Sequence, residues 1–100
     1  MNKQEIVEKL TETLKGFPQL VLAYVHGSFL NQENFHDLDL AVLLARDLDQ
    51  SRQWKCALEI AMHAEKAINH LVPIDVHLLN QAPFGFQRAV LDRGELVFES

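Results

Sequence analysis

The sequence predicts an α/β (α+β) fold: a small mixed β-sheet of about four strands with helices packed on it. Hydrophobic runs of strand length alternate along the chain with stretches in which apolar residues recur at helical spacing. Hydrophobic residues make up 48% and charged residues 23% of the chain, as in ordinary globular proteins. No repeat, low-complexity segment or linker interrupts the pattern. Residues 1–100 are therefore expected to form a single domain.

The first third of the chain is expected to form a helix and a strand. Four apolar residues fall on one helical stripe between about residues 2 and 15, with charged residues opposite. Gly16 and Pro18 end this helix. The continuous apolar run over residues 20–25 predicts a strand covered on both faces. A polar connection with room for one helical turn follows over residues 29–36.

The middle of the chain is expected to form a second strand, over residues 37–45, and a long helix. Asp47, Asp49 and Ser51 are candidates for the N-cap of that helix, which is predicted to run to about residue 71. A mostly apolar stripe follows one side of it, made of Trp54, Leu58, Ala61, Met62, Glu65 and Ile68.

The last third of the chain is expected to complete the sheet. Pro73 leads into a third strand over residues 74–79. Residues 84–92 are predicted to form a short helix closed by Gly94, and residues 95–99 alternate like an edge strand. Helices and strands thus alternate along the chain, which predicts one mixed sheet with helices packed against it.

Composition excludes several classes of function. The net charge of −5 argues against a protein that binds a nucleic-acid backbone or template, which would carry a basic face. A nucleotide remains compatible with this charge, because a bound metal ion reverses the local sign. The single cysteine, Cys56, excludes an intramolecular disulfide and fits a reducing compartment. Without a basic-then-apolar leader or an apolar run long enough to cross a bilayer, the protein is expected to be soluble and cytoplasmic.

The candidate site begins with Asp37 and Asp39, at the start of the second strand. Alternate residues of a strand share a face, so both carboxylates are expected to point the same way. Paired carboxylates suit Mg²⁺, which binds a few carboxylates together with water and phosphate oxygens. The same D-x-D spacing occurs at Asp47 and Asp49, but there the two acids lie between a strand and a helix, where aspartate caps and turns the chain. The alternative for Asp37 and Asp39 is a pair of solvated acids at a strand end.

Two further features accompany this pair of carboxylates. Gly27 and Ser28 follow the first strand, where a glycine permits close backbone approach and a serine offers a hydroxyl, although a plain tight turn explains them equally. Asp75 begins the third strand; near a metal it could hold the ion or accept a proton from an attacking hydroxyl. If that strand lies at the edge of the sheet, Asp75 is simply exposed.

The five histidines show no spacing typical of metal ligands. His77 shares a strand face with Asp75, and His36 directly precedes Asp37, so these two could contact a substrate or tune a carboxylate.

Taken in order, His26-Gly27-Ser28, residues 37–42 (DLDLAV) and residues 74–79 (IDVHLL) resemble the nucleotidyltransferase superfamily that shares the catalytic core of DNA polymerase β. Length and order resemble most the minimal nucleotidyltransferases (MNT), many of which are antitoxins paired with a HEPN-domain protein. The resemblance covers nearly the whole chain, including the closing segment over residues 81–98.

The resemblance implies a site and a reaction. Gly27 and Ser28 would hold the phosphates of a nucleoside triphosphate, Asp37 and Asp39 would bind Mg²⁺, and Asp75 would be the third carboxylate. With two Mg²⁺ ions, an acceptor hydroxyl would attack the α-phosphate of ATP and expel pyrophosphate. The implied acceptor is a hydroxyl of a partner protein, a HEPN-type helical protein in the antitoxin pairs, and the implied product is that protein carrying AMP.

Two departures from the family pattern keep other readings open. Eight residues separate Ser28 from Asp37, fewer than is usual, and no arginine follows the serine as it commonly does in the family. Lys55, Arg88 and Arg93 are possible replacements for that cation. The alternative is therefore a catalytically weakened binding module that neutralises a partner protein by stoichiometric binding. A small α/β domain without nucleotide chemistry is a third reading.

The sequence leaves the assembly of the chain open. Four aromatic residues could line a partner or oligomer interface, but core packing explains them as well: Trp54, Phe84, Phe86 and Phe98.

Overall fold

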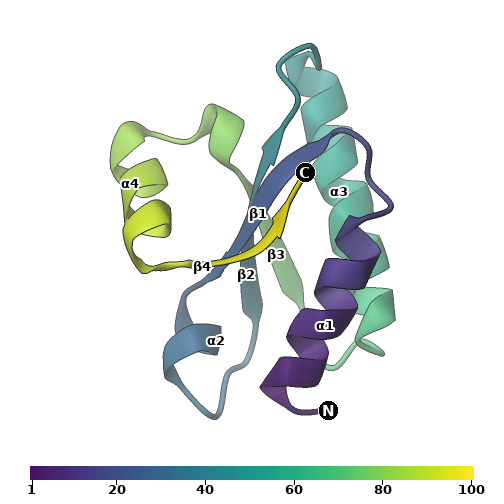
Figure 1. The fold of residues 1–100 in the computed structure, drawn as a ribbon, viewed down its shortest axis with the longest axis vertical. Coiled ribbons are helices and arrows are strands. Elements are labelled where there is room, and N and C mark those ends of the chain that lie inside the picture. Colours follow the sequence, from purple (N-terminus) through teal and green to yellow (C-terminus); the bar gives the residue numbers. More distant parts are fainter.

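A computed structural model describes residues 1–100 as four strands, four α-helices and one short 3₁₀ helix (Figure 1). In chain order these elements are α1 (Lys3–Leu14), β1 (Leu20–His26), α2 (Ser28–Asn31), β2 (Leu38–Leu44), α3 (Gln50–Ala67), β3 (Ile74–Leu78), η1 (Leu79–Gln81), α4 (Phe84–Arg93) and β4 (Glu95–Glu99). This order confirms the predicted α+β architecture with a mixed four-stranded sheet. None of the helices is both long enough and apolar enough to span a membrane.

The strands form one sheet in the order β3-β2-β1-β4. β1 pairs antiparallel with β2 and with β4, whereas β2 and β3 are parallel. A parallel pair needs a crossover connection, and α3 provides it. The registers set His26 beside Asp39 and Asp39 beside Asp75, so these three residues lie in one row across β1, β2 and β3.

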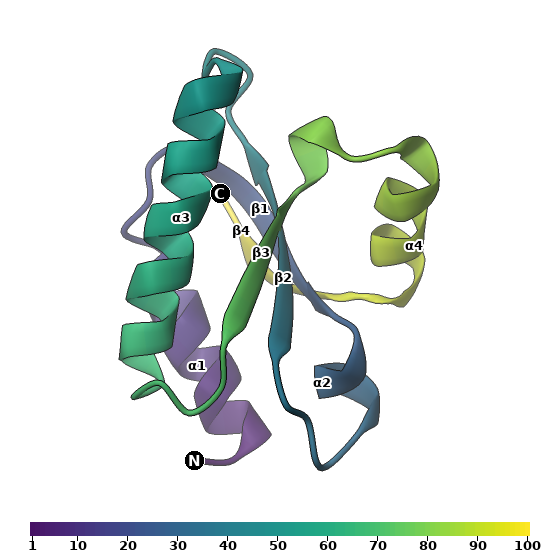
Figure 2. The ribbon, with the colours of Figure 1, turned by 180° about the vertical axis from the view of Figure 1, so that it is seen from behind.

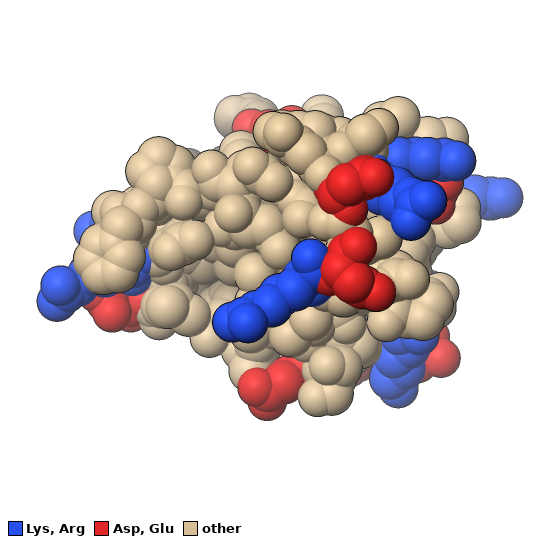
Figure 3. Space-filling view, turned by 90° about the horizontal axis from the view of Figure 1, so that it is seen from above, with Lys and Arg blue, Asp and Glu red and all other residues tan.

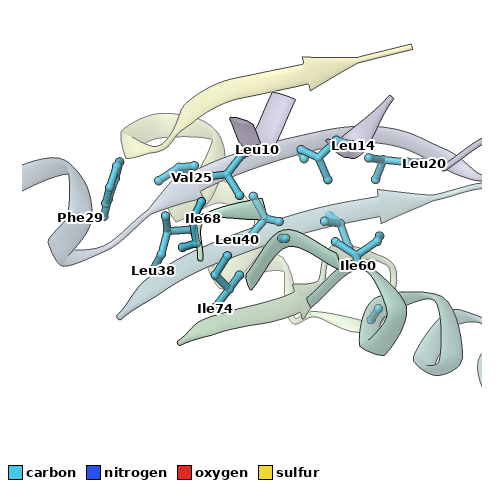
Figure 4. Close-up of a cluster of buried hydrophobic side chains, with 14 of the residues drawn as sticks. Leu10, Leu14, Leu20, Val25, Phe29, Leu38, Leu40, Ile60, Ile68 and Ile74 are labelled. Atoms are coloured by element: carbon cyan, nitrogen blue, oxygen red, sulfur yellow. The ribbon is translucent and has the colours of Figure 1, made fainter. Parts of the chain in front are cut away.

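Helices α1 and α3 lie side by side over one face of the sheet (Figures 1 and 2). Between them and the strands lies a cluster of 17 buried hydrophobic residues, which includes Leu10 and Leu14 of α1, Ile60 of α3 and Leu40 of β2 (Figure 4). Burial of this apolar surface is the main force that holds the fold together. A capping box between Asn2 and Glu5 stabilises the N-terminus of α1, and the N-cap Asp49 stabilises that of α3.

Helix α4 lies over the opposite face of the sheet (Figure 2). A second hydrophobic cluster lies between α4 and this face. Only three of its residues are buried, namely Ala41, Leu79 and Val90, with Phe86 packed against them. Amide side chains supplement this packing. Gln87 Nε2 donates a hydrogen bond to the Leu79 carbonyl oxygen at 2.8 Å, which ties α4 to the end of β3.

The sequence placed the buried side of α3 incorrectly. Trp54, Leu58 and Met62, expected on its apolar stripe, are 54%, 61% and 59% exposed. The stripe that packs on the sheet instead consists of Gln53, Ala57, Ile60 and Ala64 and continues to Ile68. Small alanines at two of these positions let the helix approach the sheet closely, so the larger apolar residues beside them are left in solvent.

The remaining differences from the predicted elements are small. α3 ends at Ala67 rather than near residue 71, because Asn69 and His70 adopt positive φ angles of 56° and 55°, which end a helix. Asp37 lies just before β2 rather than in it. Of the four aromatic residues considered for an interface, Trp54 and Phe84 are exposed. Phe86 and Phe98 are half-buried and pack against the two hydrophobic clusters.

Candidate functional site

The turn after β1 brings the backbone of Gly27 against the carboxylate of Asp39. Gly27 has φ 80° and ψ −155°, a conformation that is nearly restricted to glycine. A Cβ atom at this position would lie 2.5 Å from Asp39 Oδ2, so no larger residue fits without displacing that carboxylate. The antiparallel pairing of His26 with Asp39 produces this approach. Gly27 thus permits a close backbone approach, and the group it approaches is the carboxylate of Asp39.

The other oxygen of Asp39 faces a histidine. Nε2 of His77 lies 3.4 Å from Asp39 Oδ1, and the two side chains are 42% and 25% exposed. The Asp39 carboxylate is therefore held between the Gly27 backbone on one side and an imidazole on the other. His77 reaches this position because β3 runs parallel to β2, with Asp75 beside Asp39 and His77 two residues further on.

His26 and His77 form a cluster of rings with Phe86 of α4. Ring centroids lie 5.4 Å apart between the two histidines, 5.5 Å between His26 and Phe86, and 5.7 Å between His77 and Phe86. Burial lowers the pKa of His26 below its ordinary value; the charge of Asp39 opposes this shift, and His77 adds to it. His26 Nε2 is buried without a hydrogen-bond partner, so a donor or acceptor on a bound molecule could pair with it.

The sequence predicted a role for His77 but none for His26. The signal that could have revealed His26 is its pairing with Asp39 across β1 and β2. That register depends on the length of the connection between the two strands, which the residue pattern alone does not determine.

The three candidate carboxylates occupy different environments. Asp39 is part-buried in β2, Asp37 is half-buried just before that strand, and Asp75 is exposed on β3. β3 is an edge strand, the case in which the sequence predicted an exposed Asp75, but its register still sets Asp75 beside Asp39. No three His, Cys, Asp or Glu side chains converge closely enough to hold a metal ion by themselves.

The donor set nevertheless fits Mg²⁺. Carboxylate oxygens are ligands of the kind that Mg²⁺ prefers, and this ion is commonly held by one or two carboxylates together with substrate phosphates. A site of that type needs no preformed cluster of three protein ligands. Asp37 and Asp39, two residues apart at the start of β2, are the residues that would hold the ion, and Asp75 is the nearest further carboxylate in the row.

A cavity of about 480 Å³ opens beside Gly27, between α2 and α4. This volume is typical of sites for small molecules. On one side it is lined by His26, Gly27, Leu30 and Asn31, and on the other by Phe86, Ala89, Val90 and Arg93 of α4. Ser28, the first residue of α2, directly follows the Gly27 turn and is half-buried.

A second cavity of similar size, about 460 Å³, lies between the end of α1 and α3. Thr13, Arg52, Lys55 and His63 are among its lining residues, and none of the predicted site residues reaches it. The cavity beside Gly27 is therefore the candidate site. Viewed from above (Figure 3), the surface on the side of α4 is mostly uncharged, with charged side chains of both signs at its edge.

Comparison with known proteins gives a family and several related folds. The sequence model of a family described as polymerase beta, nucleotidyltransferase, matches residues 8–100. No curated protein sequence matches the chain significantly.

Three solved structures illustrate the structural similarity. One is a tri-AMPylated HEPN toxin in complex with an MNT antitoxin from Shewanella oneidensis, with a TM-score of 0.71 and 25% identity over 98% of this chain and 73% of the matched chain. The second is a toxin–antitoxin structure with AMP-PNP, with a TM-score of 0.63 and 25% identity over 100% of this chain and 75% of the other. The third, the toxin–antitoxin MntA-HepT, has a TM-score of 0.65 and 24% identity over 97% and 73% of the two chains, and supports the fold alone.

Proposed function

The chain belongs to the polymerase β nucleotidyltransferase family, and from this membership we propose that it transfers AMP from ATP to a hydroxyl group of a partner protein. One observation carries the proposal: the carboxylate of Asp39 lies against the backbone of Gly27, and Gly27 lines a cavity whose volume is typical of sites for small molecules. Phosphates held at the Gly27 turn would thus lie next to the carboxylate that binds the metal. A cation bound here would compensate for the partial burial of this carboxylate, whose one side-chain partner in the fold is His77.

The proposed reaction assigns a task to each residue of the site. Gly27 and Ser28 would hold the phosphates of ATP, Asp37 and Asp39 would hold Mg²⁺, and His77 keeps the Asp39 carboxylate oriented. When bound there, the ion would neutralise phosphate charge and stabilise the charge that develops during transfer. The acceptor oxygen forms a bond to the α-phosphorus. The bond between that phosphorus and the oxygen that links it to the β-phosphorus breaks, and pyrophosphate leaves. Asp75, exposed at the edge of the site, accepts the proton of the acceptor hydroxyl.

The proposed acceptor is a HEPN-type helical protein, in a toxin–antitoxin pair in which this chain is the MNT antitoxin. The support is similarity: one similar structure contains a tri-AMPylated HEPN toxin together with an MNT antitoxin, and another contains AMP-PNP.

A second candidate function is stoichiometric binding of the same partner without chemistry. Two observations favour it: no cation follows Ser28, and α3 carries Trp54, Leu58 and Met62 exposed on one side. Contiguous exposed apolar residues are typical of surfaces that bind another protein. Such a surface serves either function, so only the chemistry of the Asp39 site separates the two.

Titration of the isotope-labelled protein with ATP, followed by NMR, tests the proposed function. With Mg²⁺ present, shifts are expected at Gly27, Ser28 and Asp39, and chelation of the metal should remove most of them. Asp39→Asn should abolish the metal-dependent part, because it removes one unit of negative charge from the metal ligand. Transfer of labelled AMP to a co-purified HEPN-type partner should fall at least about 100-fold in this variant, in line with the loss of one group that stabilises the transition state.

The second D-x-D supplies the matched control. Asp47→Asn makes the same change of charge in an exposed turn and should leave ATP binding and transfer unchanged. If millimolar ATP with Mg²⁺ shifts no resonance near Gly27, the transferase proposal is wrong. Partner binding that survives Asp39→Asn would then support the stoichiometric function.

A further inference from the structure

We propose that Arg93, at the end of α4, supplies the cation that contacts the phosphates of the bound nucleotide. This inference rests on the nucleotidyl transfer proposed above and concerns the same site. A triphosphate brings several negative charges into a protein whose own net charge is −5. The segment after Ser28, residues 29–33, contains no lysine or arginine, so the cation must come from elsewhere in the fold.

The pairing of β1 with β4 explains how Arg93 reaches the site. In this antiparallel pair Tyr24 lies beside Leu96 and Val25 beside Glu95. The chain that leaves β1 therefore runs alongside the chain that enters β4, and Arg93, two residues before Glu95, lines the same cavity as Gly27. The two positions are 66 residues apart in sequence, so no local spacing could have revealed this proximity.

Close contact at Gly94 holds this junction together. A Cβ atom at Gly94 would lie 3.1 Å from the Val25 carbonyl oxygen and 3.3 Å from a ring carbon of Tyr24. The same Cβ atom would lie 2.6 Å from the Val90 carbonyl oxygen, so glycine is needed at the end of α4, and it also permits this close approach to β1. As a result Arg93 lines the same cavity as His26 and Gly27, and it is the one cationic residue among those that line it.

The other candidate cations are engaged or located elsewhere. Arg88 Nε lies 3.6 Å from Asp92 Oδ2, one turn further along α4, and Arg88 does not line the cavity. Lys55 lines the separate cavity between α1 and α3. Arg93 forms no ion pair with any residue of the chain, although Asp92 and Glu95 are near it in sequence. Its planar guanidinium group can donate two parallel hydrogen bonds to phosphate oxygens.

Arg93 also has a possible structural role, because a cation in the last turn of a helix stabilises that helix modestly. A structural role predicts an effect on folding and no preference among ligands. A phosphate contact predicts an effect that grows with the number of phosphates. The experiment must therefore compare ligands as well as variants.

Binding of ATP, AMP and adenosine to the whole chain, in the presence of Mg²⁺, provides this comparison. We expect Arg93→Gln to raise the Kd for ATP about tenfold or more, the loss typical of one hydrogen bond to a charged group. The Kd for AMP should rise less, and any binding of adenosine should be unchanged. Arg93→Lys should restore part of the ATP affinity. Arg88→Gln, which removes the same charge from the same helix outside the cavity, should bind ATP like the unaltered protein.

The outcomes separate this inference from the proposed function. If the unaltered protein binds ATP but Arg93→Gln binds it equally well, the phosphate contact is wrong and the nucleotidyl transfer is untouched. An equal loss for ATP and adenosine, or an equal loss in Arg88→Gln, also overturns the contact, because it indicates a structural effect or a general effect of charge. If the unaltered protein binds no ATP, the proposed function and this inference fall together.

Discussion

Helices α1 and α3 bury 17 hydrophobic residues against one face of the sheet, whereas the cluster under α4 on the other face contains three. All 17 buried residues of the first cluster are hydrophobic. The second face carries three polar residues near the ends of its strands, namely His26, Asp39 and His77, with a buried nitrogen of His26 left unpaired. The same strands build both faces, because alternate side chains point to opposite sides.

One face of the sheet therefore supplies most of the stability of the fold, and the other carries the polar residues of the candidate site. The face under α1 and α3 supplies the burial that holds the strands in register, and the register in turn positions the polar residues of the opposite face. Those polar residues contribute little to the stability of the fold and are unfavourable where they lack partners. The incomplete cover over the second face leaves the cavity beside Gly27 open to a ligand. Changes on the two faces should therefore have different consequences.

The largest effect on stability is expected from a cavity in the face under α1 and α3. Leu10→Ala on α1 removes a fully buried side chain and should lower the free energy of unfolding by about 3–5 kcal/mol. Leu58→Ala, the same substitution on the exposed side of α3, should change it by less than about 0.5 kcal/mol. Urea unfolding followed by circular dichroism measures both. Similar losses in the two variants would mean that the buried and exposed sides of the helices are wrongly assigned.

A smaller loss of stability with a larger loss of function is expected at Gly27. Gly27→Ala forces a side chain into a positive φ and against Asp39, and should lower stability by about 1–3 kcal/mol while abolishing metal-dependent ATP binding. Gly85→Ala provides the contrast, because a Cβ atom there meets no other atom within 4 Å and alanine favours a helix. That variant should be as stable as the unaltered protein or more so. Normal ATP binding by Gly27→Ala would contradict the role assigned to the turn.

The smallest effect is a dependence of stability on pH from His26. Burial lowers the folded-state pKa of His26 below its ordinary value of 6.5, so the unfolded chain takes up a proton at a higher pH than the folded one. Its contribution is therefore fully present above the unfolded pKa, and stability declines as the pH falls below 6.5 toward the folded pKa. In the metal-free protein, His26→Gln should flatten this part of the curve of unfolding free energy against pH. An unchanged slope would indicate that His26 is as well solvated in the folded state as in the unfolded one.

The sequence predicted the positions of the helices and strands better than it predicted which of their sides are buried. Strand and helix positions follow from hydrophobic runs, glycines and prolines, and they agree with the structure to within a few residues. The buried side of α3 was wrong because Trp54, Leu58 and Met62 form as good a helical stripe as Ala57, Ile60 and Ala64. Periodicity detects a stripe but cannot tell which of two adjacent stripes packs on the sheet.

The same limit applies to the site. Asp37, Asp39 and Gly27 stand out in the sequence because they lie near one another along the chain. Arg93 was one of three possible cations in the sequence, and its place beside Gly27, like that of His26 beside Asp39, follows only from the pairing of β1 with β4 and with β2. Strand register is set by packing and by the lengths of the connections, and neither can be read from single residues.

The position of β1 between β2 and β4 has a consequence for synthesis. While a ribosome is still adding residues up to about position 90, β1 has β2 on one side and no neighbour on the other. Its apolar edge is then open to strands of other nascent chains, and such an edge is a known route to aggregation. Because α4 and β4 emerge after β1 and β2, the wall of the cavity that contains Arg93 forms later than the Gly27 turn. A nascent chain that still lacks α4 and β4 can therefore already hold its Gly27 turn, but it has no closed pocket in which to retain a nucleotide.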